Sequence, residues 1–152
     1  MAAKYERIPL EWLIQQKLYL KPLWDKFSVP QQTFIKAAYG LPLITDMELK
    51  AWSVLNQACE YDELGYVTSY QPVPYNAKEY GEIVGLIGRR AGKSYMTCFM
   101  LLYEALFGGH LDHVEAGQDL VIPYVAQDLA TAKSNMRYVS SLAMKVEKLA
   151  KE

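Results

Sequence analysis

The segment 88–94, which reads G-R-R-A-G-K-S, constrains the fold more than any other part of the chain. A short apolar run precedes it over 82–87 (E-I-V-G-L-I), and a segment rich in Met, Phe and Leu follows it over 95–107. The first run predicts a buried strand and the second a buried helix. A Gly-Lys-Ser turn between a strand and a helix is typical of a phosphate-binding loop, because glycine admits a phosphate close to the backbone and the helix supplies amide groups. These residues therefore predict an α/β fold with a nucleotide site at the loop.

The loop departs in two ways from the strict pattern G-x-x-x-x-G-K-[ST]. Counting back from Gly92, the first glycine is expected at position 87, but the chain has Ile87 there and Gly88 one position later. Arg89 and Arg90 also lie inside the loop, where small residues are usual. Two neighbouring guanidinium groups repel each other unless an anion is bound, and with phosphate they form bidentate contacts. The alternative interpretation is a surface turn whose basic residues are incidental.

A second strand and a long helix are predicted after the loop. Residues 119–126 (D-L-V-I-P-Y-V-A) resemble a buried strand, in which Pro123 is tolerated only at an edge or a bulge. The order strand, helix, strand, helix predicts a right-handed crossover and a P-loop NTPase-like parallel sheet, of which the chain holds the first strands only. Two strands alone make a poor sheet, because a parallel sheet needs cover on both faces. The last helix carries an apolar stripe that favours packing on a sheet over a coiled-coil seam: Leu129, Ala132, Met136, Val139, Ala143, Val146 and Ala150.

Three helices are predicted in the first sixty residues. The first covers 10–20 and ends before Pro22. The second begins after Ser28 and stops at Gly40. The third begins at Thr45, which forms a capping box with Glu48. The residues expected on the apolar faces are Leu10, Leu13, Ile14 and Leu18, then Phe34, Ile35 and Ala38, then Leu49, Trp52 and Leu55.

These patterns divide the chain into three parts. Residues 1–60 form a helical N-terminal segment, and residues 82–152 form an incomplete P-loop ATPase core. Between them, residues 61–81 carry five tyrosines, two prolines and two glycines, a composition that predicts a linker without regular structure.

Charge and cysteine content exclude several classes of protein. Sixteen basic and seventeen acidic residues give a net charge of -1, without the basic excess of a protein that grips DNA alone through its phosphates. The apolar run 98–102 is far shorter than the roughly 20 residues needed to cross a bilayer, so no membrane association is expected. Cys59 and Cys98 are too few for a disulfide framework and favour a reducing cytoplasm, with Cys98 filling the core. We interpret His110 and His113 as part of a polar loop, not as metal ligands.

The G-R-R-A-G-K-S loop resembles the variant Walker A motif of large terminase subunits, the ATP-driven motors that package DNA into tailed-phage heads. Further stretches are similar to one terminase group in the same order: F-I-K-A-A-Y-G-L-P-L (34–43), Y-E-A-L-F-G-G (103–109), A-G-Q (116–118), the run 121–126, and T-A-K and M-R-Y-V within 131–139. The resemblance extends from about residue 27 to the end of the chain.

The resemblance implies a role for each loop residue. Lys93 would bind the β- and γ-phosphates of ATP, and Ser94 would bind Mg²⁺. Backbone amides would come from Gly88, Ala91 and Gly92. Arg89 and Arg90 lie where terminases place an arginine that stabilises the transferring phosphoryl group or couples neighbouring subunits.

Two further residues are candidates for recognition of the base. Tyr70 and Gln71 lie about seventeen residues before Gly88, where helicase-like ATPases place an aromatic residue and a glutamine that contact adenine. The alternative is that these loop residues pack on the edge of the sheet.

The resemblance also implies partners and a place in the cell. The full motor would act on double-stranded DNA and contact the portal protein and the small terminase subunit, in a bacterial host cytoplasm with the gene carried by a virus or prophage. An exposed sheet edge would favour self-association into a homo-oligomer.

Hydrolysis needs an acidic pair at the end of a later strand, and Asp128 follows the wrong strand. We therefore expect an N-terminal terminase portion that binds ATP weakly and turns over little. The other interpretations are a non-catalytic module that docks through residues 1–60, and a fragment of a helicase-like P-loop ATPase.

Overall fold

The computed structural model describes residues 6–115 and 117–151, and the chain forms two compact units. One unit combines the N-terminal residues up to Asp25 with the residues from Ile87 onward, and the other is Lys26–Leu86. These units do not follow the predicted division into 1–60, 61–81 and 82–152. Ala116, which begins the A-G-Q stretch, lies outside the described residues.

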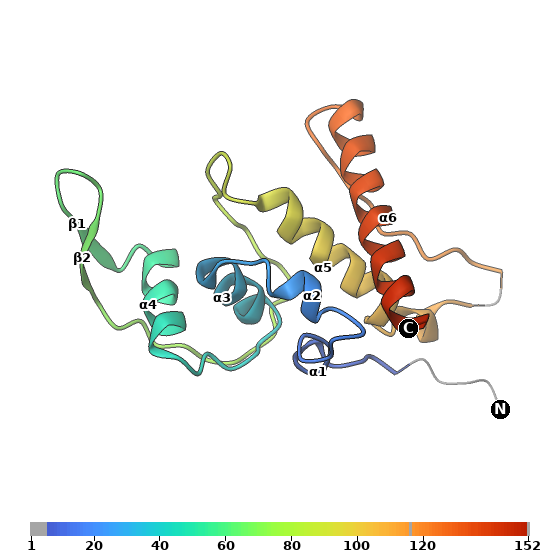
Figure 1. The fold of residues 1–152 in the computed structure, drawn as a ribbon, viewed down its shortest axis with the longest axis horizontal. Helices are drawn as coiled ribbons and strands as arrows, with labels where there is room; N and C mark the ends of the chain where they lie inside the picture. Colours follow the sequence, from blue (N-terminus) through green and yellow to red (C-terminus); the bar gives the residue numbers. More distant parts are fainter. Residues whose placement is uncertain (1–5, 116, 152) are drawn as a thin grey trace. The chain divides into compact units, whose positions relative to one another are not determined.

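The first unit is helical. It contains α1 (Leu10–Leu13), α2 (Lys21–Trp24), α5 (Lys93–Phe107), the 3₁₀ helix η1 (His110–His113) and α6 (Leu129–Lys151). α5 packs against α6, as Figure 1 shows. Burial of apolar side chains from all four α-helices removes their surface from water and stabilises the unit. The core side chains are Leu10, Leu13, Ile14, Leu20, Leu23, Trp24, Met96, Cys98, Phe99, Leu102, Tyr103, Val139, Leu142 and Val146.

The N-terminal residues belong to this unit because they are attached along α5. The Ile8 amide donates to the Phe107 carbonyl over 2.9 Å, and the Tyr103 hydroxyl donates to the Ile8 carbonyl over 2.9 Å. Further along α5, the rings of Trp24 and Phe99 lie 5.9 Å apart. Contacts between residues so distant in the sequence cannot be read from a local pattern.

The predicted helix over 10–20 is wrong in its length. α1 ends at Leu13, and the amides of Gln15 and Gln16 then donate to carbonyls three residues back, so the chain tightens into turns. Leu18 is half exposed as a result, whereas Leu20 is fully buried. The proline expected to end the helix lies instead at the start of α2, where its fixed backbone angle is favourable.

The second unit contains α3 (Val29–Ala38), α4 (Asp46–Leu55), β1 (Cys59–Tyr61) and β2 (Val67–Tyr70). The predicted starts of both helices are confirmed. The Ser28 amide donates to the Gln31 side chain over 2.9 Å, and Thr45 and Glu48 exchange two hydrogen bonds of 3.0 and 3.2 Å. Each bond satisfies an amide that the first turn leaves unpaired.

Gly40 ends α3 as predicted, and the structure gives it two reasons to be glycine. Its φ of +65° is unfavourable for other residues. A Cβ atom at this position would also lie 2.5 Å from the Glu79 amide nitrogen, because the chain returns there to pair with Tyr39. The absence of a Cβ atom at Gly40 therefore leaves room for residues 78–79 to pack against the end of α3.

The buried face of α4 differs from the predicted one. Leu49 and Leu55, expected to face the core, are 42% and 40% exposed. Glu48 and Ala51 are buried in their place. The Glu48 carboxylate accepts a hydrogen bond from the Lys36 ammonium, so the inward face of α4 includes a polar contact with α3.

A β-hairpin spans the end of the predicted helical segment and the first half of the predicted linker, where no regular structure was expected. β1 pairs antiparallel with β2, with Cys59 opposite Tyr70. The turn between them is fixed by Asp62, whose carboxylate accepts from the amides of Leu64 and Tyr66 over 3.0 and 2.8 Å. An aspartate that bonds to amides further along its own turn stabilises a tight reversal. The remainder, 71–81, contains no helix or strand, apart from the isolated bridge at Glu79.

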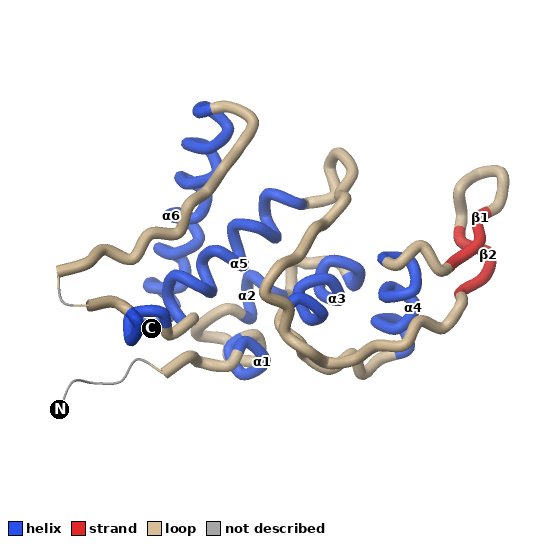
Figure 2. Tube along the Cα trace, turned by 180° about the vertical axis from the view of Figure 1, so that it is seen from behind, coloured by secondary structure: helices blue, strands red, loops and turns tan. Residues whose placement is uncertain are grey.

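The two predicted parallel strands are not formed. Residues 82–87 and 119–126 are both loops, which Figure 2 shows as tan chain leading into α5 and α6. Leu86 and Val125 in these segments are 95% and 92% exposed. The described residues therefore contain helices and one two-stranded antiparallel sheet, not the predicted P-loop NTPase-like sheet. A parallel sheet needs neighbouring strands to pair with and helices over both faces, and two apolar runs alone do not supply them.

The apolar stripe of α6 is buried only in its second half. Val139 and Val146 are buried as expected, together with Leu142, which lies outside the predicted stripe. Leu129 and Met136 are 69% and 42% exposed. The side chain of Ala150 lies outside the described residues. The N-terminal half of the helix is open only in part, because Asn135 and Tyr138 contact α5 there while Leu129 and Met136 remain exposed.

Candidate functional site

The loop 88–92 turns directly into α5, whose first residue is Lys93. Gly92 precedes the helix in the left-handed conformation, with φ 75° and ψ 15°. Successive residues of opposite hand point neighbouring N–H groups to the same side, an arrangement that binds anions. Because Gly92 has no side chain to cap the helix, the first amides of α5 receive no capping bond from that position. The predicted approach of a phosphate to this turn is therefore compatible with the backbone.

Arg90 is a second left-handed residue in the loop, with φ 63°. This conformation costs a residue with a Cβ atom about 1–2 kcal/mol. Non-glycine residues in this region concentrate at functional sites, where the surrounding structure maintains the strain. The strained residue, Arg90, is one of the two loop arginines predicted to contact phosphate.

The loop side chains form an uncompensated positive group. Arg89, Arg90, Lys93 and Ser94 are all exposed. No carboxylate within the described ranges pairs with any of the three cations. An ion pair between Lys93 and a carboxylate would have argued against a role in phosphate binding. The described residues contain no such ion pair. Three like charges within five residues attract an anion.

Gly88 is not required by the fold of the loop. A Cβ atom there would meet nothing within 4 Å, and its φ is not positive. In this structure the position tolerates a larger residue. If Gly88 has its predicted role, a side chain at this position would obstruct the phosphate without destabilising the turn.

Tyr70 and Gln71 lie in the other unit. Tyr70 belongs to β2, and the Lys50 ammonium lies 5.7 Å from the centroid of its ring. The ring also lines a hollow of about 220 Å³ between α3, α4 and β2. The Gln71 amide donates to the Ala58 carbonyl over 2.9 Å, which extends the hairpin. Both residues thus have structural contacts within Lys26–Leu86, whereas the loop 88–94 belongs to the first unit.

Sequence reasoning missed a pair of tyrosines beside the loop. The ring centroids of Tyr95, in the first turn of α5, and Tyr138, in α6, lie 5.8 Å apart. The Tyr95 hydroxyl donates to the Leu23 carbonyl over 2.9 Å, and burial, with a smaller effect of Tyr138, raises the pKa of Tyr95 to about 12. Tyr138 itself is 41% exposed. No local pattern links residues 43 positions apart, so the pair emerges only from the packing of α5 on α6.

Asp128 and His110 have structural roles. Asp128 precedes α6 and accepts from both the amide and the hydroxyl of Thr131, each over 2.8 Å. These hydrogen bonds lower the pKa of Asp128. His110 Nε2 lies 2.6 Å from a carboxylate oxygen of Glu104. Within the described residues, no three His, Cys, Asp or Glu side chains lie close enough together to bind a metal ion. His113 therefore belongs to no such group.

Cys98 is a core residue, as predicted. It is fully buried, burial raises the pKa of its thiol, and its Sγ atom lies 3.7 Å from the Asn135 carbonyl. It therefore helps to join α5 to α6.

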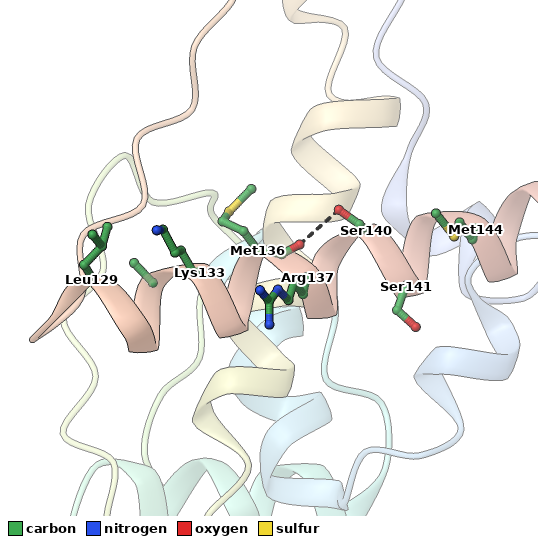
Figure 3. A pocket seen from close by; sticks show the side chains of 8 residues that line it. Leu129, Lys133, Met136, Arg137, Ser140, Ser141 and Met144 are labelled. Atoms are coloured by element: carbon green, nitrogen blue, oxygen red, sulfur yellow. Dashed lines mark hydrogen bonds between the residues drawn. The ribbon is translucent and has the colours of Figure 1, made fainter.

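The outer face of α6 carries a shallow groove, shown in Figure 3. Its volume is about 710 Å³. Apolar side chains alternate with the cations Lys133 and Arg137, which have no carboxylate partner in the part of the chain that the structure describes. The lining residues are Leu129, Ala132, Lys133, Met136, Arg137, Ser140, Ser141 and Met144.

Residues 6–115 and 117–151 include no helix with both the length and the apolar character needed to cross a lipid bilayer. Comparisons of the chain with family models, with curated proteins and with solved structures gave no match. The loop 88–94 and the first turn of α5 are therefore the features that bear on function.

Proposed function

We propose that residues 88–94 bind the triphosphate of ATP together with Mg²⁺, and that the chain is the N-terminal ATP-binding portion of a terminase large subunit. One observation carries the proposal. The left-handed Gly92 stands immediately before the first turn of α5, beside three cations that have no carboxylate partner among the described residues. Backbone amides, a helix N-terminus and positive side chains are the three features that hold a polyphosphate.

Each loop residue has a separate task in this proposal. The Lys93 ammonium neutralises the β- and γ-phosphates, and the Ser94 hydroxyl is a ligand of Mg²⁺. The amides of Gly88, Ala91 and Gly92 surround the phosphate oxygens. Arg89 and Arg90 make bidentate contacts, which become stronger as charge develops on the transferring phosphoryl group.

Binding without turnover is the expected behaviour of these 152 residues. Hydrolysis needs an acid that orients water beside the phosphate, and Asp128 is already engaged in capping α6. We propose that residues 82–87 and 119–126 become strands when neighbouring strands form hydrogen bonds with them. Their exposed apolar side chains, including Val84 and Val121, support this part of the proposal.

The same proposal implies the partners of the full motor. These are double-stranded DNA, the portal protein and the small terminase subunit, in the cytoplasm of a bacterial host. The exposed groove on α6 and the exposed segment 119–126 also favour self-association of the chain.

Binding of a fluorescent ATP analogue with Mg²⁺ tests the proposal. We expect Lys93→Ala to weaken binding at least tenfold, because removing a charge-assisted contact to phosphate costs roughly 1.5–3 kcal/mol. Lys133→Ala, which removes an exposed cation from the α6 groove, is the matched control and should bind like the wild type. Equal affinity of the wild type and Lys93→Ala would refute the site.

A non-catalytic interaction module is the second candidate. The observation that favours it is the rigid hairpin turn held by Asp62, which leaves Leu64 and Tyr66 83% and 69% exposed. Ordered, exposed apolar side chains are typical of protein-binding surfaces. Capture of portal protein or small terminase subunit that survives Lys93→Ala, in a chain that binds no ATP, would favour this candidate.

A further inference from the structure

We infer that the base of the bound nucleotide stacks on the ring of Tyr138 in α6, and not on Tyr70. The inference rests on the proposed function, since it needs the triphosphate at 88–94. It assigns a purine-binding platform to the first unit, which also contains the loop.

Tyr138 contacts the first turn of α5 through the ring of Tyr95. Tyr95 is the third residue of α5, about 3 Å along the helix axis from Lys93. The Tyr138 ring lies 5.8 Å from the Tyr95 ring, at an angle of 54°. Tyr138 in α6 therefore lies against a residue of the first turn of the helix that begins at the proposed phosphate loop.

The platform is held in place from two sides. The Tyr95 hydroxyl donates a hydrogen bond to the Leu23 carbonyl, and this bond restrains the orientation of the Tyr95 ring. One turn before Tyr138 in α6, the Asn135 carbonyl contacts the buried thiol of Cys98 in α5. A ring that is already ordered loses little conformational entropy when a base stacks on it.

Tyr138 also remains accessible. It is 41% exposed although it contacts Tyr95. Tyr70, the residue predicted from the sequence, already has the Lys50 ammonium over its ring. Stacking reads the flat face that every base has, so we expect little preference between adenine and guanine.

The experiment compares ATP and GTP with inorganic tripolyphosphate, each with Mg²⁺, by calorimetry. Removing an aromatic platform costs roughly 5- to 150-fold in affinity for a stacked base. We expect Tyr138→Ala to lose this factor for ATP and GTP but to keep its affinity for tripolyphosphate. Tyr138→Phe, which retains the ring, should bind all three like the wild type, and so should Tyr70→Ala.

Each other outcome overturns the inference. ATP affinity unchanged in Tyr138→Ala, or lost in Tyr70→Ala instead, places the base elsewhere. An equal loss for ATP and tripolyphosphate would mean that the substitution acts by disturbing the helix packing. Should tripolyphosphate fail to bind the wild-type chain, the loop assignment itself fails, and this result is distinct from loss of the base contact. Photolabelling by 8-azido-ATP gives an independent measurement: the label should fall on the peptide that contains Tyr138.

Discussion

Two residues of the loop carry left-handed backbone, and only one of them is glycine. Gly92 has φ 75° and Arg90 has φ 63°. The glycine was predicted to matter because it lets the backbone approach a phosphate. The conformation of Arg90 was not predictable, since an arginine has no intrinsic preference for positive φ and the sequence around it contains no signal for it.

The pair Arg89 and Arg90 allows the strain to be separated from the charge. Each replacement by glycine removes one guanidinium group, but only Arg90→Gly also relieves a positive φ. We expect the free energy of unfolding of Arg90→Gly to exceed that of Arg89→Gly by about 1 kcal/mol. Urea denaturation of the two variants measures the difference. Equal stability would show that Arg90 is not strained in solution.

Among the elements, local signals predicted the starts of α3 and α4 but not the buried face of α4. The starts at Ser28 and Thr45 were predictable because the capping atoms lie within three residues of each other. The inward face of α4 depends on Lys36, which is twelve residues away in the sequence and belongs to another helix. A periodicity of apolar residues cannot reveal such a partner.

The Lys36–Glu48 pair gives the second unit a pH dependence. Burial raises the pKa of Glu48, but the hydrogen bond from Lys36 and those from the amides of Thr45 and Ile44 outweigh it, so the pKa lies below its ordinary 4.5. A carboxyl whose folded pKa is lowered stabilises the fold above its unfolded pKa and loses that effect as the pH falls through the folded pKa.

We therefore expect Glu48→Gln to lower the free energy of unfolding by about 2 kcal/mol at pH 7, and by less at pH 3. Asp46→Asn is the control, because it removes an exposed carboxylate from the same first turn of α4. It should cost at most about 1 kcal/mol. Denaturation in urea at both pH values gives the answer, and a pH-independent loss in Glu48→Gln would contradict the account of the ion pair.

At the scale of the whole molecule, the features that sequence could not predict are those that join distant segments. The N-terminal residues pack on α5 through contacts such as Trp24 with Phe99, 75 residues apart in the sequence. The hairpin extends into a segment that composition marks as irregular, and Asp62 fixes its turn. The apolar runs 82–87 and 119–126 resemble strands, but a strand also needs neighbours to pair with, and a single run does not specify them. The proposed phosphate loop could be suggested from the sequence because all of its chemistry lies within seven consecutive residues.

The central claim is that the turn before α5 surrounds a polyphosphate with its amides. The most direct measurement is a titration of the ¹⁵N-labelled chain with inorganic tripolyphosphate, followed by the backbone amide signals. The account predicts saturable shifts centred on Gly88, Gly92, Lys93 and Ser94, and their loss in Lys93→Ala. Unchanged signals at these four residues, or shifts confined to Lys133 and Arg137 on α6, would contradict it.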